Sequence, residues 1–128
     1  LQPTISLSTA ESEYYALSQA MRVLLPIRSL VEELMQNVHI PPSLQTLGNH
    51  ICATVHEDNT SCLSLANDQR ITSRTRHYHV RWHFFWHHVN QGNVEVVYVE
   101  TNKQDADYLT KSLPVEPFLA NRKRVQGW

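Results

Sequence analysis

Three carboxylates in this chain stand where acids can do chemistry. Glu13 lies in the first turns of a predicted helix, Asp58 directly follows a predicted strand, and Asp107 lies in a predicted helix near the C-terminus. Carboxylate oxygens are preferred ligands of hard divalent cations, and several of them converging on one point can hold a metal cluster. Taken singly, none is a strong signal, because each has an ordinary structural alternative.

Helical geometry separates Glu13 from its neighbour Glu11. Ser8 and Glu11 have the spacing of a capping box, in which each side chain accepts a hydrogen bond from the backbone amide of the other residue. We therefore expect Glu11 to cap the helix and to point away from any site. Glu13 instead heads an apolar stripe at helical spacing, formed by Leu17, Ala20 and Leu24. A carboxylate above a buried stripe is costly unless it is paired or bound to a cation, although a rim glutamate can also bend to water.

The other two acids also have alternative roles. Asp58 falls at the carboxyl end of its strand, where open α/β sheets place their sites. It could equally cap the helix that follows, although Asn59 could do that as well. Asp107 could simply be stabilised by the positive end of the helix dipole and could pair with Lys111, four residues later.

The elements that must position these acids follow from the pattern of the chain. We expect a helix over 9–36 that Pro26 kinks or breaks, strands over 51–57 and 94–100, and helices over 60–67, near 80–90 and over 101–113. This order predicts an α/β fold with parallel strands. Two strands cannot cover the apolar faces of four helices, so we expect the chain to lack the opening strands of a larger domain.

Composition narrows the class of protein. The 128 residues suit one small domain, and 41% hydrophobic content is enough for a modest core. A formal charge of −1 argues against an overall basic nucleic-acid binder, so any such role must be local. Cys52 and Cys62 are expected to be reduced thiols of an intracellular protein. No apolar run approaches ~20 residues and no leader is visible, so no membrane partner is predicted.

Four segments, in this order, resemble the ribonuclease H region that closes the polyprotein of copia-type LTR retrotransposons: LSTAESEYYAL, VHEDNTSCLSLAN, RTRHYHVRWHFFWHHV and ADYLTKSL. The resemblance runs from Gln2 to about Gly127. It implies a ribonuclease H-like fold, with a mixed sheet flanked by helices. The implied activity is hydrolysis of the RNA strand of RNA–DNA hybrids during reverse transcription, with Mg²⁺ or Mn²⁺ as cofactor. The motifs assign Glu13, Asp58 and Asp107 as catalytic residues and metal ligands.

The same resemblance implies partners and a location. The partners are an RNA–DNA hybrid and the upstream polymerase region of the same polyprotein. The location is intracellular, in a cytoplasmic virus-like particle or the nucleus.

The chain departs from the family pattern in its acids. The family's first-strand aspartate has no counterpart, because nothing precedes Leu1 to supply it, and His79 and His87 stand where acids are usual or common. Loss of a bridging carboxylate should cripple a two-metal site. We therefore expect a partial, N-terminally truncated ribonuclease H-like domain over 1–113 and a tail over 114–128. We also expect no ribonuclease activity from the chain alone. An inactive or domesticated remnant with residual nucleic-acid binding, or with no function, is the alternative.

A basic stretch is the best candidate for nucleic-acid binding. Between Gln69 and Val94 there is no Asp or Glu, and arginines alternate with aromatic residues. Arginine suits phosphates, and aromatic faces can stack on bases. We predict that the binding residues are Arg74, Arg76, His77, Arg81 and, outside the stretch, Asn59. A solvated basic helix with its aromatic residues in the core is the alternative, and the four-residue spacing of His79, His83 and His87 leaves a transition-metal site open.

Overall fold

A computed structural model describes residues 8–37, 50–73, 75–76, 78 and 82–128. The chain divides into two compact units, Leu1–Tyr98 and Val99–Trp128, and each is described by itself. The domain boundary expected from the sequence, between residues 113 and 114, falls inside the second unit.

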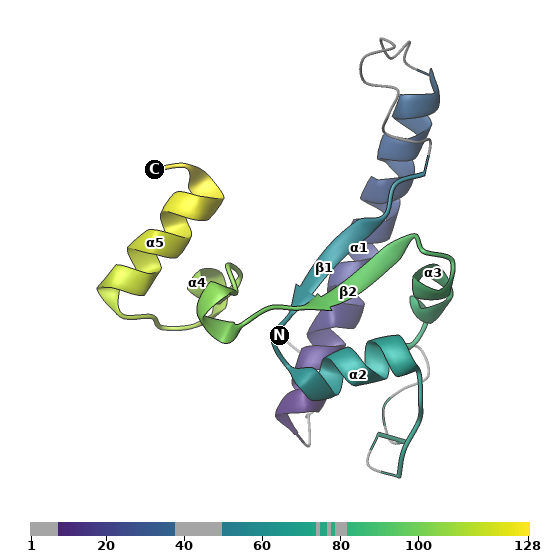
Figure 1. The fold of residues 1–128 in the computed structure, drawn as a ribbon, viewed down its shortest axis with the longest axis horizontal. Helices are drawn as coiled ribbons and strands as arrows, with labels where there is room; N and C mark the ends of the chain where they lie inside the picture. Colours follow the sequence, from purple (N-terminus) through teal and green to yellow (C-terminus); the bar gives the residue numbers. More distant parts are fainter. Residues whose placement is uncertain (1–7, 38–49, 74, 77, 79–81) are drawn as a thin grey trace. The chain divides into compact units, whose positions relative to one another are not determined.

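The first unit is an α/β arrangement around two strands (Figure 1). Its elements are α1 (Thr9–Asn37), β1 (Ala53–Glu57), α2 (Thr60–Asp68), α3 (Trp86–Asn90) and β2 (Val94–Tyr98). The strands pair in parallel from Ala53 opposite Val94 to Glu57 opposite Tyr98. The predicted order of elements and the parallel pairing are therefore confirmed, and the sheet has two strands within the described residues.

Helix α1 runs continuously through Pro26, so the proline does not break it. The Glu11 amide donates to Ser8 Oγ at 3.2 Å, which is one half of the predicted capping box. The buried face is rotated relative to the predicted stripe, since Ala20 is exposed and Leu24 is only partly buried. The buried residues of α1 are Glu11, Tyr14, Leu17, Ser18, Met21, Leu25 and Arg28. Glu11 is therefore buried, which the capping-box pattern did not predict.

An aromatic cluster explains this rotation. Tyr78, Trp82 and Phe85 are buried and pack with Tyr14, whose ring centroid lies 5.7 Å from Tyr78 and 5.8 Å from Phe85. The core is completed by one face of α2 and by Val94 and Val96 of β2. The side of α1 that meets these rings becomes the buried side, because large aromatic rings contribute most of the buried area.

Arg28 ties the second half of α1 to the start of both strands. Its Nε donates to the Ile51 carbonyl at 2.6 Å, and its Nη2 donates to Asn93 Oδ1 at 3.2 Å. The guanidinium is paired with Glu32 at 2.5 and 2.9 Å. A buried arginine is stable only when its donors are satisfied, so this network fixes the strands against the helix.

The helix expected near residues 80–90 is shorter than predicted. Its described part forms turns over residues 82–85, and α3 begins only at Trp86. Trp82, His83 and Phe85 are all buried, so packing of these rings takes precedence over a regular helix. Gly92, with φ of 70°, ends the segment before β2 as the sequence indicated.

The second unit contains a 3₁₀ turn, η3 (Thr101–Lys103), and the helices α4 (Asp107–Thr110) and α5 (Val115–Gln126). The single helix predicted over 101–113 is wrong, because Gln104 is extended and separates η3 from α4. The Lys103 amide donates to the Glu100 carbonyl at 2.7 Å, the three-residue spacing of a 3₁₀ turn and not of an α-helix. The predicted tail is mostly the helix α5.

No helix in the described part of the chain combines the length and the apolar character that crossing a membrane requires.

Candidate active site

The carboxyl end of β1 carries two consecutive acids, Glu57 and Asp58. The neighbouring Asn59 caps α2, since its Oδ1 accepts from the Ser61 amide at 3.0 Å and from the Cys62 amide at 3.1 Å. Asp58 is therefore not the helix cap, and it makes no hydrogen bond or ion pair with a described residue. The structural alternative that the sequence left open for Asp58 does not apply.

Glu13 lies in the same electrostatic environment as Asp58. Burial raises the pKa of Glu57 most, and the charges of Glu13 and Asp58 raise it further. Burial likewise raises the pKa of the Cys62 thiol, and Glu57, Glu13 and Asp58 add to the effect. Glu13 of α1 and the two acids at the end of β1 therefore act electrostatically on the same thiol. Two of the three acids selected from the sequence thus share one region.

Glu57 is the member of this group that the sequence analysis missed. It is 7% exposed, its Oε1 accepts from the Asn59 amide at 2.9 Å, and it is hydrogen-bonded to the Cys62 thiol. The signal was available in the strand pattern. Ala53, Val55 and Glu57 alternate with exposed residues, and this places Glu57 on the inner face of β1.

Asp107 belongs to the second unit. It is 7% exposed, lies in the first turn of α4 and pairs with Lys111 Nζ at 2.8 Å. The pairing that the sequence left open as an alternative is therefore present. Asp107 also lines a cavity of about 590 Å³ together with Asn121 and Arg124. Its convergence with Glu13 and Asp58 stays a prediction.

No group of three or more His, Cys, Asp or Glu side chains in the described ranges is placed to hold a metal ion. Glu13, Glu57 and Asp58 thus form an electrostatic cluster and not a preformed three-ligand cage. Of the histidines at four-residue spacing, His79 lies outside the described residues.

A buried hydrogen bond joins α1 to the aromatic segment. The Tyr14 hydroxyl and His83 Nδ1 are 2.7 Å apart, and the His83 ring stacks on Trp86 with centroids 4.1 Å apart. Burial lowers the pKa of His83 and raises that of Tyr14, so both side chains are neutral at physiological pH. His83 therefore serves as a packed core residue, and sequence spacing alone gave no sign of its partner.

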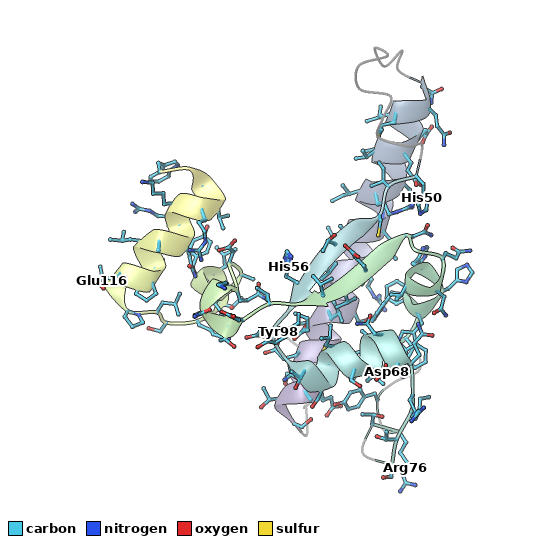
Figure 2. All side chains as sticks on the ribbon, in the orientation of Figure 1. His50, His56, Asp68, Arg76, Tyr98 and Glu116 are labelled. Atoms are coloured by element: carbon cyan, nitrogen blue, oxygen red, sulfur yellow. The ribbon has the colours of Figure 1, made fainter. Side chains whose placement is uncertain are left out.

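The predicted nucleic-acid-binding residues divide into three groups. Arg74, His77 and Arg81 lie outside the described residues. Arg76 is exposed, and Figure 2 shows it at the outer end of the segment after α2. Asn59 is occupied as the cap of α2.

The aromatic residues of the basic stretch mostly serve the core. Tyr78 is 6% exposed and Trp82 is 1% exposed, so neither presents a ring face for stacking on a base. For these two residues the alternative, in which the aromatic side chains turn inward, is confirmed.

Comparison with known proteins places this chain beside retrotransposon polyproteins. It is 28% identical over 118 residues to the Retrovirus-related Pol polyprotein from transposon TNT 1-94 of Nicotiana tabacum. It is 31% identical over 111 residues to the Transposon Ty1-DR1 Gag-Pol polyprotein of Saccharomyces cerevisiae, and 31% over 106 residues to the Retrovirus-related Pol polyprotein from transposon RE2 of Arabidopsis thaliana. No family model and no solved structure matches the chain.

The extent of these matches defines the relationship. They cover 92%, 87% and 83% of this chain, but only 8%, 6% and 6% of the three relatives. Over most of its length the chain is therefore homologous to one segment of copia-type and Ty1 retrotransposon Pol polyproteins. In those relatives the matching segment is linked to other regions of a much longer polyprotein.

Proposed function

We propose that this chain is a ribonuclease H-like segment of a retrotransposon Pol polyprotein and contributes to hydrolysis of the RNA strand of RNA–DNA hybrids. The observation that carries the proposal is that Glu13 and Asp58, two acids far apart in the sequence, both act electrostatically on Glu57 and Cys62 at the carboxyl end of β1. The relationship to Pol polyproteins supports the same assignment. The ribonuclease H-like fold, with a mixed sheet, is part of this proposal.

The donor chemistry of the site suits Mg²⁺ or Mn²⁺. Glu13 and Asp58 offer carboxylate oxygens, which hard divalent cations prefer, and neither carboxylate is occupied by an ion pair with a described residue. These two residues, together with Asp107 assigned by its motif, would hold the cation. A bound divalent cation supplies an activated water and stabilises the leaving oxygen.

The protein's own residues contribute orientation and charge. Asn59 holds the start of α2, so Asp58 is left at the strand end with its carboxylate available. Glu57, the preceding residue, is buried, and burial, then the charges of Glu13 and Asp58, raise its pKa. The exposed Arg76 adds positive charge for the phosphate backbone of the hybrid.

Substitution of the acids tests the proposal. In the full protein, Glu13→Gln, Asp58→Asn and Asp107→Asn should each lower the Mg²⁺-dependent rate of hybrid cleavage about 100-fold or more, since even outer-shell partners of a metal site are worth roughly 10- to 100-fold. Glu33→Gln and Asp105→Asn are matched controls, because Glu33 is exposed and Asp105 pairs with Arg124. Both should retain cleavage.

Two outcomes would count against the proposal. Cleavage that survives in all three acid variants would remove these residues from catalysis. The second is a wild-type protein that binds RNA–DNA hybrids and never cleaves them. That result would favour an inactive remnant with residual nucleic-acid binding.

A further inference from the structure

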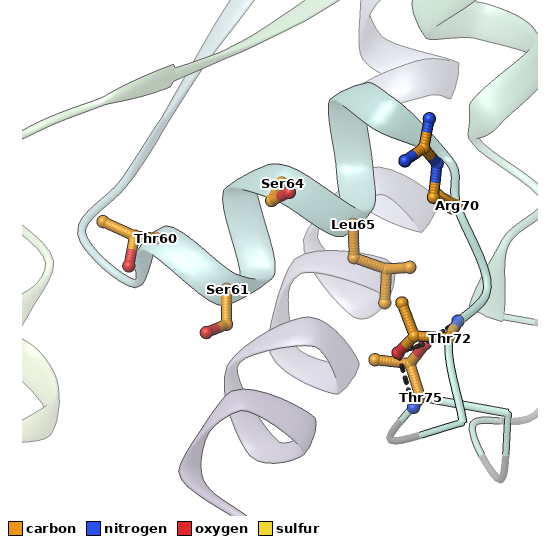
Figure 3. Close-up of a pocket in the computed structure, with 7 residues that line it drawn as sticks. All are labelled: Thr60, Ser61, Ser64, Leu65, Arg70, Thr72 and Thr75. Atoms are coloured by element: carbon orange, nitrogen blue, oxygen red, sulfur yellow. Dashed lines mark hydrogen bonds between the residues drawn. The ribbon is translucent and has the colours of Figure 1, made fainter.

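A pocket of about 280 Å³ lies beside α2 in the first unit (Figure 3). Its lining residues are Thr60, Ser61, Ser64, Leu65, Arg70, Thr72 and Thr75. Five of these seven side chains carry hydroxyls, one carries a guanidinium, and none is acidic. The lining therefore suits a ligand that accepts hydrogen bonds and bears negative charge.

Arg70 is the charged member of this lining. It is exposed, and within the described part of the chain it forms no hydrogen bond and no ion pair. A guanidinium is a fixed cation with donors in a planar fork, and this geometry matches the oxygens of a phosphate. The N–H donors of Arg70 thus have no acceptor among the described residues, and they can bind a ligand.

The opposite wall of the pocket is held by its own hydrogen bonds. The Thr72 amide donates to Thr75 Oγ1 at 3.0 Å, and the Thr75 amide donates to Thr72 Oγ1 at 3.3 Å (Figure 3). The Arg76 amide also donates to the Thr72 carbonyl at 2.9 Å. The two hydroxyls are also hydrogen-bonded to each other at 3.2 Å, so both are fixed in place, and the one that accepts in this pair keeps its O–H group to donate to a ligand.

The remaining lining residues define how the pocket can bind. Leu65 is 5% exposed and belongs to the core. Ser64 Oγ donates to Asp68 Oδ2 at 2.6 Å, so this hydroxyl is already engaged. The first amides of α2 are taken by Asn59, and recognition must therefore come from side chains, with Ser61 Oγ on the helix side.

We propose that this pocket binds one phosphodiester of a nucleic-acid strand, with Arg70 supplying the charge and the hydroxyls of Ser61, Thr72 and Thr75 supplying neutral contacts. The proposal rests on the proposed function, because it names where the backbone of that substrate is held. The absence of acids from the whole 69–94 stretch, and the exposed Arg76 directly after the threonine turn, extend the positive surface beyond the pocket. The lining residues include no carboxylate, which favours an anionic ligand over a cation.

The salt dependence of binding tests this assignment. Arg70→Gln in the full protein should weaken binding of an RNA–DNA hybrid and reduce the slope of log affinity against log salt by about one, the effect of one lost phosphate contact. Ser61→Ala should weaken binding roughly threefold to tenfold without changing the slope, since a neutral hydroxyl releases no counterion. Arg22→Gln is the control. Arg22 is also exposed but lies over the Phe84 ring at 5.6 Å, so its slope should match the wild type.

Further probes separate this proposal from the proposed function. An unchanged slope for Arg70→Gln in a protein that still cleaves hybrid would overturn the pocket assignment and leave the hydrolytic function standing. Arg70-dependent binding of single-stranded DNA by a protein that never cleaves hybrid would support the pocket and reject the hydrolytic function. Arg70-dependent binding of inorganic phosphate as tight as that of the oligonucleotides would assign the pocket to free phosphate and overturn the strand assignment.

Discussion

The hydrogen bond between Tyr14 and His83 should be one of the larger single contributions to stability in the first unit. Tyr14 is 0% exposed and His83 is 9% exposed, and the bond between them is 2.7 Å long. Tyr14→Phe keeps the ring that packs against Phe85 and removes only the hydroxyl. The substitution leaves a buried ring nitrogen of His83 without its partner, which costs about 1–3 kcal/mol.

Urea denaturation of the full protein measures this cost. With a slope of roughly 1–3 kcal/mol per molar urea, a loss of about 2 kcal/mol should lower the unfolding midpoint by about 1 M while the slope stays constant. Tyr15→Phe is the matched control. Tyr15 is only partly buried, and its ring meets the edge of Trp82 with centroids 5.2 Å apart, a contact that Phe preserves. The control should shift the midpoint far less.

A double-mutant cycle separates the bond from the packing around it. His83→Phe keeps a ring stacked on Trp86 but removes the His83 partner of the Tyr14 hydroxyl. In that background Tyr14→Phe should cost almost nothing, because replacing both partners by apolar groups of the same shape is nearly neutral. Equal midpoint shifts for Tyr14→Phe in the wild-type and His83→Phe backgrounds would refute the reasoning.

Two further predictions concern the end of β1. Asn59→Ala should lower the free energy of unfolding by about 1 kcal/mol, because it removes the cap from the Ser61 and Cys62 amides, and chemical denaturation should show no comparable loss for Asp58→Asn. Burial, then the charges of Glu13 and Asp58, raise the pKa of Glu57, so its stabilising contribution is fully present below about pH 4.5 and is lost as the pH rises through its folded-state pKa. Glu57→Gln should flatten the dependence of the free energy of unfolding on pH above about 4.5, and it should raise the denaturant midpoint at pH 7. A profile that Glu57→Gln leaves unaltered would show that Glu57 is not repelled by its neighbours.

The elements with strong local patterns were predictable from the sequence. The long helix α1, the two strands and α2 each show the expected periodicity, and β1 and β2 pair in parallel as the alternating order indicated. The segment 101–113 was not predictable in this way. Gln104 has an extended backbone between the two elements, so η3 and α4 replace one helix, and nothing in the helical pattern marks this residue.

The orientation of α1 could not be predicted from α1 alone. Its sequence offers several apolar faces, and the choice between them depends on rings from a distant segment, Tyr78, Trp82 and Phe85. This long-range packing buries Glu11 and leaves Glu13 at the partly buried rim. Within the candidate site, Glu13 and Asp58 were therefore predicted from their positions along the chain. Glu57 could be recognised only once it was known which face of β1 is buried.

The acids at the end of β1 are arranged at a cost to stability. Burial, and then the charges of Glu13 and Asp58, raise the pKa of Glu57, and none of the three acids pairs with a cationic side chain among the described residues. The capping task that would justify an acid after β1 is performed by the neutral Asn59. Uncompensated carboxylates beside a buried thiol destabilise a fold unless a positive partner is supplied from outside it. A bound divalent cation would supply that charge, so the same grouping that lowers the stability of the free protein favours a metal-dependent role for Glu13 and Asp58.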